Sequence, residues 1–171
     1  MSVETAAPQL SRIEKQHFRR VCGKFASGIT IATVLDLEGK SHGMTANSFT
    51  SVSLVPPLLL ICVDHRSKLL ECFRRNDYYG INILDQSQRH LSDRFAGSGY
   101  DRFEGVEWYP GRTGVPLLPN ALATIECKRV EMVMAGDHDI VIGEVFHATC
   151  RDGEPLVYFG SQYRQLETNG R

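Results

Sequence analysis

The stretch LATIECKRVEMVMAGDHDIVIGEVFHATC, residues 122–150, decides the class of fold. Its two halves have the composition of β-strands, and they flank the short turn AGDH at residues 135–138. Two such runs on either side of a glycine-containing turn predict a β-hairpin. The turn at residues 151–153 and the segment PLVYFG, residues 155–160, predict a second hairpin.

The N-terminal part of the chain predicts one helix. In the stretch SRIE, Ser11 is expected to be the N-cap and Glu14 the reciprocal residue of a capping box. Apolar residues then recur at helical spacing until Gly28, which predicts one apolar face that packs on a larger surface. The residues of this face are Ile13, His17, Phe18, Val21 and Phe25.

Two further segments with strand composition follow the helix. GITIATVL, residues 28–35, and HGMTANSFTSVS, residues 42–53, are separated by a turn at residues 36–40, and together they predict a hairpin. Two prolines then break the chain before LLLICVD, residues 58–64. This apolar run predicts a central strand that is buried on both faces.

The middle of the chain mixes helices and strands. Ser67 is expected to cap a short helix that runs to Arg75, with Leu69, Leu70 and Phe73 facing inward. A strand is expected at residues 78–84 and a helix at residues 86–95. Residues 97–120 contain five glycines and three prolines without periodicity, and they predict a long ordered loop that acts as a lid.

Taken together, these elements predict a mainly β protein with peripheral helices. Six or seven short strands favour an antiparallel closed barrel, because closure removes exposed sheet edges. At about 150 residues per domain, a chain of 171 residues is expected to be one domain, residues 1–171. Residues 1–10 are expected to be a flexible lead and residues 165–171 a flexible tail.

Composition excludes several classes of protein. The formal net charge is −1, so general binding to nucleic acid is not expected. No apolar run has the length of a signal peptide or a membrane span, which predicts a cytoplasmic protein without a membrane partner. The five cysteines are widely spaced and form no C-x-x-C pair, so neither a disulfide framework nor a zinc site is expected.

Three polar clusters are candidate binding sites, and each also has a less specific interpretation. Residues 45–53, TANSFTSVS, are rich in small and hydrogen-bonding side chains that suit a polar heterocycle or a phosphate, but a polar edge strand would have the same composition. Residues 64–68 place two cations at a predicted helix start, which suits an anion or simply a solvated cap. His138 lies in a tight turn between two predicted strands, where it could be functional or could simply tolerate the backbone conformation of the turn.

Common catalytic motifs are absent from the sequence. There is no H-E-x-x-H metal motif and no G-x-S-x-G nucleophile motif, and no metal site is expected. Neither G-x-G-x-x-G nor the Walker A pattern occurs. A nucleotide cofactor would therefore bind outside a Rossmann or P-loop frame.

Six ordered blocks between about Phe18 and Arg164 carry a resemblance to a known family: HGMTANSFTSVSLVPPLLLICVD, INIL, LSDRFA, DRFEGVEW, GDHDIVIGEV and YFGSQYR. In these blocks the chain resembles the flavin reductase-like family, the small reductase components of two-component flavin-dependent monooxygenases. The resemblance implies an FMN-binding split β-barrel with Greek-key topology. It also implies a homodimer that transfers hydride from NADH or NADPH to FMN or FAD, and that supplies reduced flavin to a monooxygenase.

The resemblance further implies roles for individual residues. Those expected to bind the cofactors are Thr45, Ala46, Asn47, Ser48, Ser51, Ser53, Cys62, Val63, Asp64, Ser67, Lys68, Arg94, Phe95, His138, Tyr163 and Arg164. Ser67 and Lys68 correspond to the phosphate region of the flavin. His138, Tyr163 and Arg164 correspond to the nicotinamide side, with His138 as the catalytic residue. The alternative is a flavin-binding or flavin-storage module without turnover, although such a module would not need a nicotinamide side.

Overall fold

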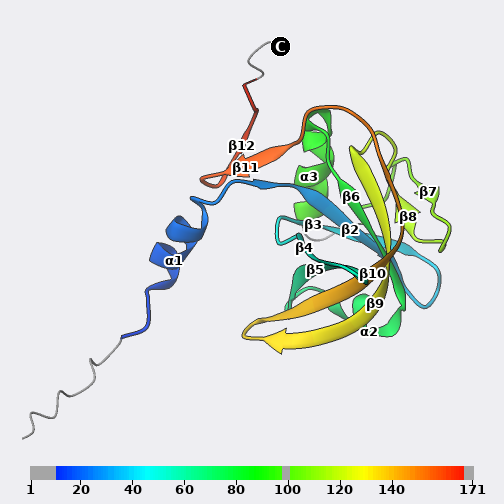
Figure 1. The fold of residues 1–171 in the computed structure, drawn as a ribbon, viewed down its shortest axis with the longest axis horizontal. Helices are drawn as coiled ribbons and strands as arrows, with labels where there is room; N and C mark the ends of the chain where they lie inside the picture. The colour runs from blue at the N-terminus through cyan, green and yellow to red at the C-terminus, as the bar shows by residue number, and fades with distance from the viewer. Residues whose placement is uncertain (1–10, 98–100, 168–171) are drawn as a thin grey trace, which may run out of the picture.

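The computed structural model describes residues 11–97 and 101–167. Its main element is a seven-stranded antiparallel sheet with the strand order β3-β2-β6-β9-β10-β5-β4 (Figure 1). The strands are β2 (Thr30–Leu35), β3 (Ser41–Ala46), β4 (Thr50–Leu54), β5 (Pro57–Asp64), β6 (Tyr78–Ile83), β9 (Ala123–Ala135) and β10 (His138–Cys150).

The mainly β class with peripheral helices is confirmed, but the sheet is open in its hydrogen bonding. Strands β3 and β4 are the two edges, and they do not pair with each other in the described part of the chain. A closed hydrogen-bonded barrel is therefore not seen. Part of the β3 edge is satisfied by a side chain, because Arg102 Nη1 donates to the Gly43 carbonyl oxygen at 2.7 Å.

Both long hairpins predicted for the main sheet form. β9 and β10 pair antiparallel around Gly136, whose φ of 67° favours glycine. β2 and β3 pair from Thr30 with Ala46 to Leu35 with Ser41. These pairings set the positions of the GDH turn and of the polar segment that follows β3.

The hairpin predicted between β10 and residues 155–160 is wrong. β11 (Val157–Phe159) pairs instead with β1 (Ser27–Gly28) and β12 (Gln162–Arg164) in a separate three-stranded sheet. The strand predicted at residues 28–35 is divided for the same reason, since β1 belongs to this small sheet and β2 to the main one.

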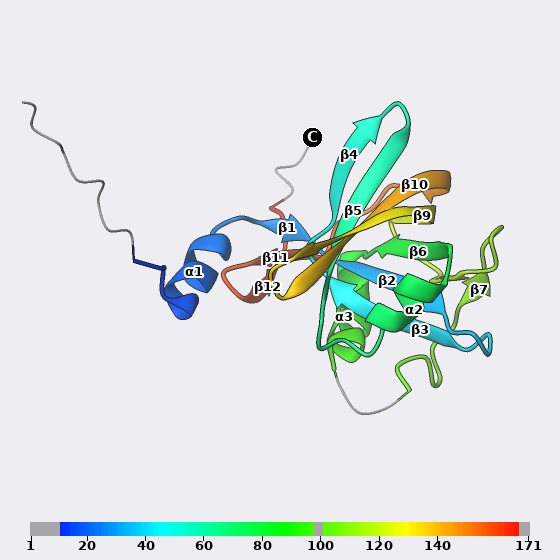
Figure 2. The ribbon, with the colours of Figure 1, turned by 90° about the horizontal axis from the view of Figure 1, so that it is seen from below.

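Helix α1 (Lys15–Cys22) begins later than predicted. Its N-cap is Glu14, whose carboxylate accepts hydrogen bonds from the backbone N–H groups of Gln16 and His17 at 2.9 and 3.0 Å. The capping box that starts at Ser11 is therefore wrong. The predicted apolar face is present but uncovered, because none of the helix residues is buried. Figure 2 shows α1 projecting from the body of the molecule.

The other helices confirm the predicted inward faces. α2 (Leu70–Arg75) starts after Leu69, so Ser67 is not its N-cap, but Leu69, Leu70 and Phe73 are buried as expected. A 3₁₀ turn (Gln86–Gln88) leads into α3 (Arg89–Ala96), which packs on β3. The contact is close: a Cβ added at Gly43 would lie 2.7 Å from Cε1 of Phe95.

Strand β5 differs from its prediction as a central strand. Leu59, Ile61 and Val63 are buried, whereas the side chains that alternate with them are half-buried. β5 lies next to the edge strand β4, so one of its faces is only partly covered. The half-buried face includes Cys62.

Residues 101–120 were predicted to be a lid, but several of their side chains are part of the core. They contain the two-residue strands β7 (Tyr109–Pro110) and β8 (Pro116–Leu117), and Phe103 and Leu118 are buried in the second of two apolar clusters. The buried Glu126 holds this segment through the backbone N–H of Thr113, at 2.7 Å. Among the residues described, no helix is long and apolar enough to cross a membrane.

Candidate active site

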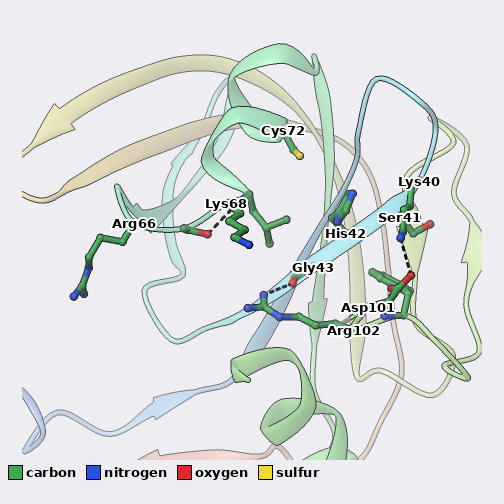
Figure 3. A pocket seen from close by; sticks show the side chains of 12 residues that line it. Lys40, Ser41, His42, Gly43, Arg66, Lys68, Cys72, Asp101 and Arg102 are labelled. Carbon is green, nitrogen blue, oxygen red and sulfur yellow. Dashed lines mark hydrogen bonds and ion pairs between the residues drawn. The ribbon is translucent and has the colours of Figure 1, made fainter. Parts of the chain in front are cut away.

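The main pocket has a volume of about 680 Å³ and lies beside the free edge of β3 (Figure 3). Three segments enclose it: the N-terminal half of β3 with the preceding turn, the loop between β5 and α2, and the start of the 101–120 segment. Its lining residues are Lys40, Ser41, His42, Gly43, Arg66, Ser67, Lys68, Leu69, Cys72, Asp101, Arg102 and Phe103. The predicted site residues Ser67 and Lys68 are thus in the pocket.

The loop between β5 and α2 is fixed by its own hydrogen bonds. The Asp64 carboxylate accepts from the Arg66 guanidinium at 2.6 Å and from the Arg66 backbone N–H at 2.8 Å. These bonds hold the pKa of Asp64 well below its usual range. Ser67 Oγ accepts from the backbone N–H of Leu69 at 3.3 Å. Lys68 forms no ion pair within residues 11–97 and 101–167, so its charge is available to a ligand.

Arg102 is a second pocket cation without a carboxylate partner in the described chain. Its guanidinium donates to the carbonyl oxygens of Gly43 and Gly97, at 2.7 and 2.5 Å. Arg94 supports it from behind, because Arg94 Nε donates to the Arg102 carbonyl oxygen at 2.7 Å. Arg94 was expected to touch the flavin, but its guanidinium is bound to backbone carbonyls of the 101–104 segment.

The polar segment at residues 45–53, which begins at the end of β3, contains some side chains that are hydrogen-bonded within the protein and some that are not. Thr45 Oγ1 donates to the Ser92 carbonyl oxygen at 2.7 Å, and Ser48 Oγ accepts from the Cys62 backbone N–H at 3.0 Å. The latter bond connects the segment to the half-buried face of β5. The Asn47 amide is exposed and makes no hydrogen bond within the described residues. Asn47 is therefore one of the polar side chains here that are free to bind a ligand.

Of the sixteen expected cofactor residues, Ser67 and Lys68 line the main pocket and the other fourteen do not. The side chains of Val63 and Phe95 are fully buried in the two apolar clusters. Ser51 and Ser53 are on the edge strand β4, opposite Leu59 and Leu58 of β5. None of the four lines the pocket.

The GDH turn lies beside the end of β5. His138 is the register partner of Asp64, so the turn and the loop at residues 64–68 meet at one end of the sheet. His138 Nδ1 is 2.7 Å from Oδ1 of Asp137, and the pKa of the Asp137 carboxyl is lowered by this hydrogen bond. The imidazole is thus oriented by its neighbour and remains partly exposed, with 39% of its side chain accessible.

Tyr163 and Arg164 occupy a different region from His138. The Tyr163 hydroxyl lies 2.9 Å from Ser92 Oγ and 2.8 Å from Asp93 Oδ1, on α3. Burial, and then the neighbouring Asp93 carboxylate, raise the pKa of Tyr163. Both residues line a smaller pocket of about 330 Å³. Tyr163 and Arg164 were expected to lie with His138 on the nicotinamide side. Within the described residues of one chain, no hydrogen bond or shared pocket joins either residue to His138.

Sequence reasoning missed a buried carboxylate behind the GDH turn that is bound by two partly exposed basic side chains. Asp139 is 4% exposed, and its carboxylate binds His65 at 2.7 Å and Arg74 at 2.9 Å. A charged residue at a position where strand alternation expects burial was the available signal. The two pocket residues His42 and Arg102 were also missed. Within the described residues, no group of three or more His, Cys, Asp or Glu side chains is placed to hold a metal ion.

Comparison with known proteins gives a consistent family. The model described as a flavin reductase-like domain matches residues 22–167. The chain is 42% identical over 172 residues to an NADH-dependent flavin reductase of Rhodococcus sp., covering 98% of this chain and 96% of that protein. It is 40% identical over 146 residues to an FMN reductase (NADH) of Agrobacterium fabrum, covering 85% and 83% of the two chains.

A solved structure agrees with the sequence relatives. The NADH:FAD oxidoreductase SgcE6 of Streptomyces globisporus C-1027, in complex with NAD and FAD fragments, superposes with a TM-score of 0.88 at 34% identity. The match covers 96% of this chain and 100% of that one. The likeness therefore extends over almost the whole of the fold described above.

Proposed function

The chain belongs to the flavin reductase-like domain family, and from this premise we infer that it is an NAD(P)H:flavin oxidoreductase. Hydride passes from NADH or NADPH to FMN or FAD. The observation that carries this function in the structure is the main pocket, which contains two cations without a carboxylate partner in the described residues and is lined by Gly43, two residues before the polar segment at residues 45–53. A cationic pocket with adjacent neutral hydrogen-bonding groups suits a phosphorylated heterocycle.

The donor set of the pocket fits a flavin phosphate. Lys68 supplies a flexible ammonium, and Arg102 supplies a guanidinium whose position is fixed by two carbonyl oxygens. Ser67 contributes a hydroxyl at the same wall. The Asn47 amide and the backbone groups of residues 45–48 would hydrogen-bond the polar edge of the isoalloxazine ring.

The residues of this chain mainly position the reactants. Bound flavin supplies the hydride acceptor, which takes two electrons and a proton from C4 of the reduced nicotinamide. Asn47 and nearby backbone N–H groups stabilise negative charge on the reduced ring. His138, oriented by Asp137, would hold the nicotinamide and so help to keep the two reactants close together and shielded from water.

A cofactor matrix tests the proposed function. Purified protein is mixed under air with each combination of FMN or FAD and NADH or NADPH, and nicotinamide oxidation is followed at 340 nm. At least one pairing is expected to turn over far above the rate of the mixture without protein, and without added metal. If all four pairings stay at the background rate while flavin fluorescence is quenched, the chain is a flavin-binding module.

The partner of the reaction is a flavin-dependent monooxygenase. Relatives carry names such as reductase subunit of a flavin-dependent monooxygenase in Rhodococcus jostii and reductase component of a resorcinol hydroxylase in Rhizobium sp.. The transfer needs only diffusible reduced flavin, so the chain requires no docking face for the oxygenase. Reduced flavin can reach the oxygenase by diffusion only if both proteins are in the same compartment, which we expect to be the cytoplasm.

The working unit is a homodimer. Helix α1 has a face with no cover in one chain: Phe18 is 54% exposed, Val21 52%, and Phe25, just beyond the helix, 82%. Large apolar side chains gathered on one face are typical of a contact surface. A twofold contact through this face buries them against the same face of a second copy or against the exposed β4–β5 tip, where Leu54 is 89% exposed.

A further inference from the structure

We propose that His65 is a positioning residue, which fixes the place of His138 and acts on the reaction through it. The proposal rests on the proposed function, in which His138 holds the nicotinamide. It is based on two hydrogen bonds, which tie His65 to the residue before His138 and to the residue after it.

The backbone and the side chain of His65 bind the two neighbours of His138. The His65 backbone N–H donates to the Asp137 carbonyl oxygen at 3.0 Å, and His65 Nε2 lies 2.7 Å from Oδ1 of Asp139. An ionised carboxylate only accepts hydrogen bonds, so Nε2 carries the proton that is donated to Asp139. The chain on both sides of His138 is therefore held by one residue of the neighbouring loop.

The Asp139 carboxylate is a firm anchor for this contact. Asp139 is 4% exposed, whereas 33% of the His65 side chain is accessible. A buried carboxylate that loses a donor keeps the cost of its desolvation, so the folded protein favours the arrangement in which His65 is bound. Arg74 binds the other oxygen at 2.9 Å and fixes the orientation of the carboxylate. Movement of His65 is thus transmitted to the chain at His138.

The neighbours of His65 in the loop do not supply the same link. Asp64 is the register partner of His138, but its carboxylate binds Arg66 within its own loop at 2.6 Å. Ser67 Oγ accepts from the backbone N–H of Leu69. Among the described residues, the loop at residues 64–68 makes no other side-chain hydrogen bond to the GDH turn or to Asp139. The role is therefore assigned to the His65 side chain.

Steady-state kinetics of two His65 variants test the role. With flavin saturating, so that a change in flavin affinity does not enter, His65→Asn is expected to lower kcat/KM for the reduced nicotinamide about tenfold. The Asn amide takes the place of Nδ1 and is too short to reach Asp139. The Gln amide in His65→Gln extends to the place of Nε2 and should keep the rate within about twofold of wild type. His90→Asn, at an exposed position on α3, is the matched control and should leave the rate unchanged.

A double-mutant cycle tests whether His65 acts through His138. In combination with His138→Ala, His65→Asn should cause no further loss, because the group that it positions is already missing. Asp139→Asn weakens the same bond from its other side and should lower kcat/KM severalfold at saturating flavin. The test therefore does not depend on the folding of one variant, which circular dichroism checks in each case.

The outcomes separate this role from the proposed function. A wild-type protein without turnover would overturn the proposed function and the positioning role with it. An active wild type whose rate is unchanged by His65→Asn would overturn the positioning role alone. Multiplying losses in the double variant, or a rate that His65→Gln does not keep, would also overturn it, because His65 would then act independently of His138 or of its bond to Asp139.

Discussion

Nε2 of His65 lies 2.7 Å from Oδ1 of Asp139, and this contact joins the loop at residues 64–68 to the strand that begins at His138. Arg74 of α2 binds the other oxygen of the same carboxylate at 2.9 Å. One buried carboxylate thus holds together the loop at residues 64–68, helix α2 and the GDH turn.

Replacing Asp139 with Asn should loosen the loop at residues 64–68, which we propose binds the flavin phosphate. The amide keeps the shape of the side chain but removes the charge that both His65 and Arg74 face, so flavin affinity should fall severalfold and the melting temperature by a few degrees. Glu71→Gln is a suitable control, because it alters the exposed partner of Arg74 and leaves Asp139 intact. Unchanged flavin affinity in Asp139→Asn would separate this cluster from the site.

The Asp139 carboxylate should also make the folding stability depend on pH in the acidic range. Its hydrogen bonds with His65 and then Arg74 hold the pKa of the Asp139 carboxyl below its ordinary value. The folded protein therefore binds fewer protons here than the unfolded chain, so the stabilisation is complete above about pH 4 and lost as pH falls through the folded-state pKa. The difference in melting temperature between wild type and Asp139→Asn should shrink below pH 4, and a difference that stays constant from pH 7 to pH 3 would contradict this.

The helices, most strands and the mainly β class could be predicted from the sequence, but not all of the strand pairing could. Alternation and turn residues located β9 and β10, and the inward face of α2, because these depend on neighbours in the chain. The pairing of β11 with β1 could not be predicted, since the two strands are about 130 residues apart in the sequence. Closure of the barrel was inferred from the number of strands, whereas one carbonyl group of the open β3 edge is bonded by Arg102 from a distant loop.

In the candidate site, too, the residues that were predicted are those marked by local sequence, and the residues that were missed are brought in by the tertiary fold. Lys68 and Ser67 were placed in the pocket by their position at the end of a strand, which is a local signal. Arg102 and His42 join them only through the tertiary fold, and no pattern in the sequence distinguishes them from surface residues. Phe95 fills the core against Gly43, although its position in the motif LSDRFA suggested a flavin contact.

Lys68→Ala should weaken flavin binding through charge. Removing an uncompensated ammonium from the phosphate site is expected to reduce affinity for both FMN and FAD about tenfold. Because the contact is electrostatic and exposed, the difference from wild type should narrow at high salt. Lys128→Ala, at an exposed position on β9, is the control. A salt-independent loss would indicate a folding defect, to be checked by circular dichroism.

His138 and Asn47 should separate the two substrates. His138→Ala is expected to lower kcat/KM for the nicotinamide about tenfold with little change in flavin affinity. Asn47→Ala should mainly weaken flavin binding, since its exposed amide has no partner in the described chain. Steady-state kinetics at saturating flavin, together with fluorescence quenching, distinguish the two effects. Equal losses of flavin affinity in both variants would show that the GDH turn contacts the flavin or has a structural role.

Substitutions on α1 should separate the subunits. Phe18→Ser with Val21→Ser removes two large apolar side chains that are 54% and 52% exposed in one chain, so the folded subunit loses no buried packing. Light scattering of wild type at micromolar concentration is expected to give twice the 19.2 kDa chain mass, and the double variant should shift toward a single chain. The exposed change Lys24→Gln, close to α1 in the sequence, controls for a general effect of altering this region. A wild-type monomer, or a variant that remains fully dimeric, would place the contact elsewhere than the face of α1.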